Sequence, residues 1–420
     1  MIFYIDSLNI RNFKGLGALD FTFADNRPVV FIGENGAGKT SLLAAINIAL
    51  RQFTSRIQNP KAFGRVLDDT YIRNGESSVE ISIELNTDRN RFGWRISRSK
   101  IEPQQRRDRD VIGLKEALES YSQLGGDRPL PLIAYYPTNR AVLEIPLKIK
   151  TQLEFHPADA YETSIKDLGL NFRQFFEWFR MREDLENELI RDDPSTIDLQ
   201  LKAVRGAMQA FDPAYSGLRV RRNPLRLVVI KKNTTQQSEL SFDQLSDGEK
   251  CAIALIGDIA RRLAISDPSS SRPLENAGVV LIDEIELHLH PSWQRRIVPL
   301  LSLVFPNCQF FITTHSPQAL SEIQRAYVFN LAATDHGAVV ETVGKWYGKD
   351  SNRILEDLMG VDERPNKVKE EIRLLFRQID DGDLAAARRS LQVISEQIGS
   401  DDPSYARASV LIRKKEVLGR

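Results

Sequence analysis

The sequence predicts an α/β fold in which a mainly parallel sheet is flanked by helices. Short apolar segments at residues 29–32, 279–282 and 309–313 indicate buried strands, and helical patterns lie between them. The first of these strands leads into G-x-x-x-x-G-K-T at residues 33–40 and then into a helix, the context that a phosphate-binding loop requires. The second strand ends in the acidic pair Asp283 and Glu284. Strands that alternate with helices in this way favour parallel pairing.

The N-terminal half begins with short strands and passes into a helical region. Alternation or apolar runs predict strands at residues 3–10, 19–23, 29–32, 79–85, 92–96 and 131–136, of which 79–85 and 92–96 suggest an antiparallel pair. A helix is expected at 41–50, and residues 159–211 are mainly helical. There, an aromatic stripe follows i, i+3, i+4, i+7 spacing, and we interpret it as core rather than a ligand site: Phe172, Phe175, Phe176 and Phe179.

The C-terminal half returns to strands near residues 218–230, followed by a helix at 248–264. Another helix, at 293–303, separates the last two apolar strands. The tail after about residue 350 is helical. Its apolar stripes are Val368, Ile372, Leu375, Phe376 and Ile379, and then Leu384, Ala387, Leu391, Ile394 and Ile398.

The composition is ordinary for a globular chain, with 42% apolar and 27% charged residues. A length of 420 residues exceeds one compact core, so two or three lobes are expected. No apolar run reaches the roughly 20 residues that span a bilayer, so we expect no membrane partner. Cys251 and Cys308 both lie in apolar segments, which argues against a disulfide framework and fits a reducing cytoplasm.

The net charge of the chain does not favour nucleic-acid binding, because its 57 basic and 57 acidic residues cancel. Contact with DNA would need a local patch. The two candidates are Arg95, Arg98, Lys100, Arg106, Arg107 and Arg109, and Arg219, Arg221, Arg222, Arg226, Lys231 and Lys232. We interpret both as solvated outer faces, with a DNA surface as the alternative.

The glycine-rich loop predicts a nucleotide site. Its glycines let backbone N–H groups converge on phosphate oxygens, and the dipole of the following helix favours an anion. Lys39 is expected to reach the β- and γ-phosphates, and the Thr40 hydroxyl to bind Mg²⁺. The residues expected to bind the nucleotide here are Gly33, Glu34, Asn35, Gly36, Ala37, Gly38, Lys39, Thr40 and Ser41.

The stretch LIDEIELHLHP at residues 281–291 allows two interpretations. In a continuous strand, Glu286, His288 and His290 would share one face, as a zinc or iron site needs. Alternatively, the strand ends at the acidic pair, where Asp283 holds Mg²⁺ and Glu284 polarises the attacking water. We prefer the second interpretation, because Pro291 and the helical pattern behind it indicate that the chain turns first.

Two further segments suit the same chemistry. LSDGEK at residues 245–250 precedes a helix, so Ser246, Gly248 and Glu249 lie at a helix N-terminus, which is a ready anion site. FFITTH at residues 310–315 is an apolar strand that ends in His315, placed to contact a γ-phosphate. Taken alone, the first could be a simple N-cap turn and His315 an ordinary loop histidine.

In this order the motifs resemble the ABC-type ATPase heads of the branch that contains SMC, RecF and OLD-family proteins. IRNFKG at residues 10–15 resembles the opening strand of these heads, LSDGEK their signature, and TTHSP at residues 313–317 their switch histidine. The resemblance implies a mixed sheet with helices on both sides, an antiparallel β subdomain, a helical insertion and a helical C-terminal tail. It divides the chain into an N-terminal ATPase lobe (1–158), the insertion (159–215), a C-terminal ATPase lobe (216–347) and a tail (348–420).

The resemblance also implies how the site works. Two heads would sandwich ATP, so that Ser246 and Gly248 contact the γ-phosphate held by Gly38 and Lys39 of a partner subunit, in a homodimer or a higher oligomer. Lys39, Glu284 and His315 would act in hydrolysis, and Thr40 and Asp283 would hold Mg²⁺. The choice of ATP over GTP rests on the resemblance alone. One departure is that no residue is assigned as the glutamine that these heads carry after the strand at 131–136, where Asn139 and Arg140 are the candidates to replace it.

The tail distinguishes between members of this branch. A nuclease of the OLD type would carry a D-x-D motif after a buried strand, whereas Asp381-Gly382-Asp383 lies between helices and is expected to be a turn. The tail from residue 358 to residue 420 and the segment at residues 135–140 resemble the ATPases of Septu-type and some retron-associated anti-phage systems, in which a small HNH nuclease is the partner. A RecF-like DNA-repair loader, an OLD-like nuclease, a scaffold that binds ATP without turnover and a transporter head are the alternatives.

Overall fold

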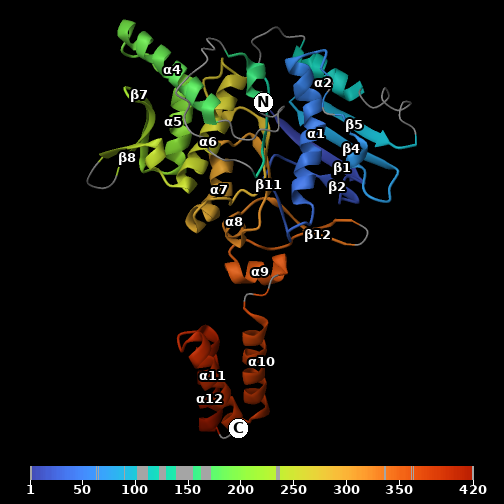
Figure 1. Ribbon diagram of the computed structural model, residues 1–420, viewed down its shortest axis with the longest axis vertical. Helices are drawn as coiled ribbons and strands as arrows, with labels where there is room; N and C mark the ends of the chain where they lie inside the picture. The colour runs from blue at the N-terminus through green and yellow to red at the C-terminus, as the bar shows by residue number, and fades with distance from the viewer. Residues whose placement is uncertain are drawn as a thin grey trace. The chain divides into compact units, whose positions relative to one another are not determined.

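A computed structural model describes residues 2–62, 64, 66–88, 90–101, 112–122, 129–138, 155–161, 172–232, 237–334, 337–360, 362 and 364–418 (Figure 1). The chain divides into two compact units, Met1–Lys349 and Asp350–Arg420. The finer division of the first unit into two ATPase lobes and an insertion stays a prediction.

A six-stranded, mainly parallel sheet forms the centre of the first unit, as the sequence predicts. Its order is β13 (Val339–Thr342), β12 (Tyr327–Ala332), β3 (Val29–Gly33), β11 (Cys308–Thr313), β10 (Gly278–Ile282) and β6 (Leu132–Tyr136). Only the pairing of β12 with β13 is antiparallel. All residues of β10 and β11 are buried, which is why these strands are continuous apolar runs rather than alternating ones.

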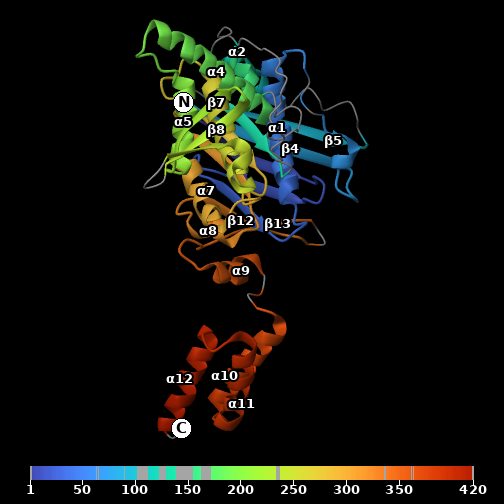
Figure 2. The same cartoon turned by 60° about the vertical axis from the view of Figure 1, so that its left-hand side comes forward.

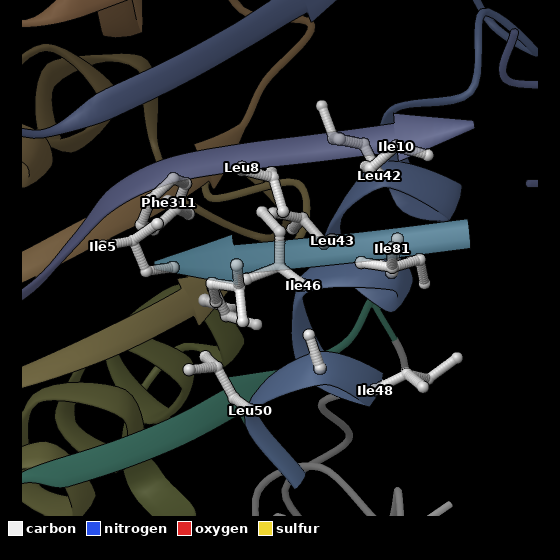
Figure 3. Packing of buried hydrophobic residues seen from close by; sticks show 14 of the residues in the cluster. Ile5, Leu8, Ile10, Leu42, Leu43, Ile46, Ile48, Leu50, Ile81 and Phe311 are labelled. Carbon is white, nitrogen blue, oxygen red and sulfur yellow. The ribbon is translucent and has the colours of Figure 1, made fainter. Parts of the chain in front are cut away.

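A separate antiparallel sheet has the order β2 (Ala18–Thr22), β1 (Phe3–Arg11), β4 (Ser78–Thr87) and β5 (Arg91–Ser99). The predicted pairing of the last two strands is confirmed. Helix α1 (Lys39–Gln58) contacts strands of both sheets, and Figure 3 shows its Leu42, Leu43 and Ile46 side chains beside those of β1 and β4. It is longer than predicted and is buried over most of its length. Helix α2 (Ile112–Ser122) packs on β5.

A helical region and a third sheet complete the first unit. They comprise α4 (Phe172–Asp192), α5 (Leu199–Phe211), β7 (Tyr215–Arg222), β8 (Leu225–Lys232), β9 (Gln237–Ser241) and α6 (Asp247–Ser266) (Figures 1 and 2). The aromatic stripe is core, as predicted: Phe172 stacks on Phe242 with ring centroids 4.2 Å apart. A Cβ at Gly257 would lie 2.9 Å from the Phe175 ring, so glycine allows α4 to approach α6 closely.

Helices α7 (Pro291–Val304) and α8 (Pro317–Ser321) follow β10 and β11. The second unit contains α9 (Ser351–Met359), α10 (Asn366–Asp381), α11 (Leu384–Ile398) and α12 (Pro403–Leu418). Its core is built from the predicted stripes together with α12, and consists of Leu375, Ile379, Ala387, Ile394, Ala408 and Ile412. Within the described residues, every helix is too short or too polar to span a bilayer.

The D-x-D sequence is a turn between helices, as predicted. Gly382 adopts a left-handed conformation as the C-cap of α10. The Asp383 carboxylate accepts a hydrogen bond from the Ala386 N–H as the N-cap of α11. The carboxylate that a nuclease motif would need is therefore used to cap a helix.

Candidate functional site

The loop between β3 and α1 has the geometry of an anion cradle. Gly33, Gly36 and Gly38 have φ angles of 139°, 82° and 99°, which L side chains rarely adopt. A Cβ at Gly33 would lie 2.2 Å from the Leu331 carbonyl oxygen. Gly38 is the N-cap of α1 and has no side chain that could occupy the N–H groups of the first turn. These N–H groups are suited to phosphate oxygens.

Lys39 is buried at the start of α1. Its Nζ donates to the carbonyl oxygens of Gly33 and Glu34, at 2.8 Å each, and this holds the ammonium group against the loop. Burial lowers the pKa of Lys39, while the nearby carboxylates of Glu284, Glu286 and Asp283 raise it. The structure therefore brings the loop lysine and the carboxylates after β10 into one electrostatic site. Thr40 lies beside it, exposed, in the first turn of the helix.

Asp283 is fully buried directly after β10. Its N–H donates to the Tyr136 carbonyl oxygen at 2.9 Å, and its Oδ1 accepts from the Thr313 hydroxyl at 2.5 Å. The Thr313 oxygen in turn accepts from the Glu284 N–H at 2.7 Å, so one hydroxyl orients both members of the acidic pair. Asp283 Oδ2 is buried and has no hydrogen-bond partner among the described residues. Such an oxygen suits a cation or its hydration shell.

The chain turns after Asp283, as the preferred interpretation predicts. Glu284 and His288 have φ angles of 47° and 66°, which end the strand. His290 caps α7, its ring nitrogen accepting from the Ser292 N–H. No group of three or more His, Cys, Asp or Glu within the described ranges could hold a metal ion. The alternative zinc or iron site at Glu286, His288 and His290 requires a continuous strand, and it is wrong because the strand ends at Ile282.

Glu286 has a different role, which the sequence did not reveal. Its Oε1 accepts from the His315 N–H at 2.6 Å, so the loop after β10 fixes the backbone of the histidine after β11. Its Oε2 is buried and has no hydrogen-bond partner in the described part of the chain. The Ser316 hydroxyl, one residue on, donates to Gln294 at 2.6 Å. In the sequence, the contact between Glu286 and His315 is indicated only by three polar residues, Thr314 to Ser316, directly after the apolar strand.

The LSDGEK turn caps helix α6 and packs beside the loop after Asp283. The Ser246 hydroxyl accepts from the Glu249 N–H, and the Glu249 carboxylate accepts from the Ser246 N–H at 2.9 Å, in a capping box. A Cβ at Gly248 would lie 2.6 Å from the His288 carbonyl oxygen, so this turn packs on the loop after Asp283. Among the described residues, no hydrogen bond links Ser246, Gly248 or Glu249 to the phosphate loop of the same chain.

Glu249 also lies in an ion pair. Its Oε1 accepts from Lys231 Nζ and, at 3.1 Å, from the Tyr215 hydroxyl. Burial alone would raise the pKa of Glu249, but hydrogen bonds from Lys231 and Ser246 outweigh burial and hold it at about 2. Burial and the adjacent carboxylate raise the pKa of Tyr215. The carboxylate is therefore ionised at neutral pH and fixed at the start of α6.

The basic residues of β7 are paired within the chain. Arg219 and Arg221 both hydrogen-bond to Glu239 of β9, with Arg221 Nη2 at 2.6 Å. Arg222 donates to Glu183 at 2.7 Å. The other predicted basic group behaves similarly: Arg95 pairs with Glu80, Arg98 with Asp69, and Lys100 Nζ donates to the Glu76 carbonyl oxygen. Arg106, Arg107 and Arg109, and likewise Asn139 and Arg140, lie outside the described residues.

Comparison with known proteins identifies the family of the chain. Residues 29–321 match the family described as "AAA domain, putative AbiEii toxin, Type IV TA system". The chain is 29% identical to the retron Ec83 probable ATPase of Escherichia coli, over 98% of this chain and 87% of that protein. It is 28% identical to the retron Vc95 probable ATPase of Vibrio cholerae serotype O1 biovar El Tor, over 89% and 82%.

Similarity to a Septu system protein covers a smaller part of the chain. Septu protein PtuA of Bacillus thuringiensis is 27% identical over 46% of this chain and 50% of its own length. Among solved structures, an SMC head bound to the C-terminal winged-helix domain of ScpA aligns with 81% of this chain and 98% of its own, at 17% identity and a TM-score of 0.49.

Proposed function

The chain belongs to this family of AAA domains, within the SMC, RecF and OLD branch of ATPases, and on that basis we propose that it binds and hydrolyses ATP as a regulatory subunit of a bacterial anti-phage defence complex. The observation that carries the proposal is the meeting of a buried lysine, a glycine cradle and a buried Asp283 oxygen without a partner among the described residues. The names of the retron and Septu relatives support the defence role.

Each side chain of the site has a proposed task. Lys39 leaves its two carbonyl acceptors and binds the β- and γ-phosphates, while the N–H groups of the loop and of α1 bind the remaining phosphate oxygens. Thr40 and Asp283 offer the hard oxygen donors that Mg²⁺ prefers, and the ion supplies charge neutralisation on the triphosphate. Glu284 polarises the attacking water, and His315, fixed by Glu286, contacts the γ-phosphate.

Phosphate release by the purified full-length chain tests hydrolysis. We expect Mg²⁺-dependent turnover, and Glu284→Gln should lower it at least about 100-fold because it removes the proposed general base while leaving ATP bound. Glu119→Gln is the control, because Glu119 is an exposed residue of α2. Equal turnover in the Glu284→Gln variant and the wild type would contradict the proposed role of Glu284.

The proposed ATP sandwich has a test of its own. Lys39→Ala disables the phosphate loop, and Ser246→Arg disables the signature. If the signature acts in trans, each variant is inactive alone, but a mixture forms heterodimers with one intact site. Activity should then return to about a quarter of wild type, since half of the dimers are mixed and each has one working site of two. A mixture as inactive as its components would exclude action in trans.

We also propose that the partner is a small HNH-type nuclease, controlled by the ATP-dependent dimer. Support comes from the resemblance to Septu and retron ATPases and from the use of Asp383 as a helix cap rather than as a nuclease residue. Purification of the tagged chain from its own host, followed by mass spectrometry, tests this proposal. A stoichiometric HNH protein is the expected result; recovery of replication or repair proteins instead would contradict it.

A further inference from the structure

A buried polar cluster joins the signature helix α6 to the edge strand β6. Asp258, fully buried on α6, accepts through Oδ1 from Arg261, at 2.7 and 2.9 Å. Its Oδ2 accepts from Arg262 at 2.6 Å and from the Tyr136 hydroxyl at 2.9 Å. Burial alone would raise the pKa of Asp258, but Arg262 and Arg261 hold it at about 2, so the carboxylate is ionised at neutral pH. A buried ion with defined partners tolerates little displacement.

Tyr136 connects this cluster to the acidic pair. It is the last residue of β6, and its carbonyl oxygen accepts from the Asp283 N–H at 2.9 Å, while its hydroxyl reaches Asp258. From Asp283 the Thr313 hydroxyl continues the contacts to the Glu284 N–H. An unbroken series of contacts therefore leads from α6 through one tyrosine to the residues proposed to bind Mg²⁺ and to activate water.

Ser246, the signature residue, is the N-cap of α6. Asp258 lies twelve residues further along the helix, which corresponds to ~18 Å at the helical rise per residue. A continuous helix of this length moves largely as one body, so a displacement at Ser246 also displaces Asp258. We propose that Tyr136 and Asp258 are positioning residues that couple the signature end of α6 to Asp283 and Glu284.

This inference rests on the proposed ATPase function and adds a means of control to it. When the signature of one chain contacts a nucleotide bound to a partner subunit, the positions of Asp283 and Glu284 in the first chain would change. The resemblance implies a glutamine after β6 to which no residue of this sequence is assigned, and Tyr136 supplies a connection at the end of that same strand.

Two tyrosine variants make a matched test in the full-length chain. Tyr136→Phe removes the hydrogen bond to Asp258. Tyr161→Phe removes a hydrogen bond to the Pro131 carbonyl oxygen, 2.7 Å away at the start of β6, and Tyr161 is equally buried. Each variant loses one buried hydrogen bond and should lower Tm by about a few degrees, with the larger decrease in Tyr136→Phe because its acceptor is ionised. Only Tyr136→Phe should lower kcat, by about tenfold, with less than about a twofold change in the KM for ATP. Equal kcat values in the two variants would overturn the coupling.

Hydrogen exchange with a non-hydrolysable ATP analogue tests the coupling without turnover. In the wild-type dimer the analogue should slow exchange both at residues 247–258 and at residues 278–284. In Tyr136→Phe the two responses should separate, with residues 278–284 losing the change that accompanies dimer formation. A wild-type chain that responds in this way but releases no phosphate would contradict the proposed hydrolysis while supporting the coupling. Independent responses in the wild type would overturn the coupling.

Discussion

On β7, Arg219 and Arg221 both pair with Glu239. After β10 of the six-stranded sheet, by contrast, Asp283 and Glu286 each keep one buried carboxylate oxygen without a hydrogen-bond partner among the described residues. Both regions are rich in charge in the sequence. On β7 and β9 two arginines share one carboxylate, whereas the carboxyl ends of β10 and β11 leave acceptors that are unpartnered within the described part of the chain beside the Lys39 ammonium group. Because buried polar groups are normally satisfied, the second arrangement indicates a ligand site.

The largest effect should follow from removing the ammonium group of Lys39. Lys39→Ala leaves the phosphate loop and three carboxylates without the ammonium group that faces them, so ATP affinity and turnover should both fall, with turnover lower on the order of 100- to 1,000-fold. Phosphate release and binding of a fluorescent ATP analogue measure the two effects. Lys115→Ala is the control, because Lys115 is exposed on α2. Wild-type binding in Lys39→Ala would show that this lysine is not part of the site.

Thr313 allows a test of the hydrogen bonds that hold Asp283 and Glu284 in place. Thr313→Val keeps the shape of the side chain but removes the hydroxyl that donates to Asp283 and accepts from the Glu284 N–H. Both groups then lose a buried partner, which costs about 1–3 kcal/mol of stability. We expect kcat to fall about 10- to 100-fold. Urea unfolding and phosphate release measure the two effects.

Thr313→Ser is the matched control, since it retains the hydroxyl and should retain most of the activity. If the valine and serine variants had equal kcat, the hydroxyl would have no part in orienting the acidic pair.

A substitution on β9 should release the paired arginines of β7. Glu239→Gln removes the carboxylate shared by Arg219 and Arg221, and leaves two guanidinium groups free to meet phosphates. Affinity for double-stranded DNA at low salt should rise about tenfold, and the slope of log K against log salt should steepen by about 1–2. Fluorescence anisotropy over a salt series measures this. Glu341→Gln, at an exposed position of β13, is the control. An unchanged salt slope would mean that β7 presents no latent DNA surface.

The comparison also shows which parts of the molecule the sequence can predict. The glycine loop at residues 33–40, the strand before Asp283 and the strand before His315 are local patterns, and each occupies the predicted type of element. The stripe from Phe172 to Phe179 is local in the same sense, since helical spacing alone places it in the core.

Contacts between distant residues could not be predicted in this way. Thr313 meets Asp283 only because β10 and β11 are neighbours in the sheet, and 30 residues separate them in the chain. Arg221 pairs with Glu239 because β8 brings β7 and β9 into one sheet, and β9 carried no clear signal of alternation. From the sequence alone, the arginines of β7 resemble a DNA-binding surface, because the pairing of β9 that brings Glu239 to them is not visible.

The smallest effect concerns the charge balance at the start of α6. Lys231 and Ser246 hold the pKa of Glu249 at about 2, below its ordinary value of 4.5, so the ionised carboxylate stabilises the folded state. For a depressed pKa this contribution is complete above about pH 4.5 and is lost as the pH falls through about 2. Glu249→Gln keeps the capping box but removes the charge, and should lower the free energy of unfolding by about 1 kcal/mol at pH 6, allowing for solvent screening of the partly exposed pair. Urea unfolding of both proteins between pH 6 and pH 2.5 should show the difference shrinking toward zero. A difference that stayed constant over this range would assign the effect to packing rather than to the ion pair with Lys231.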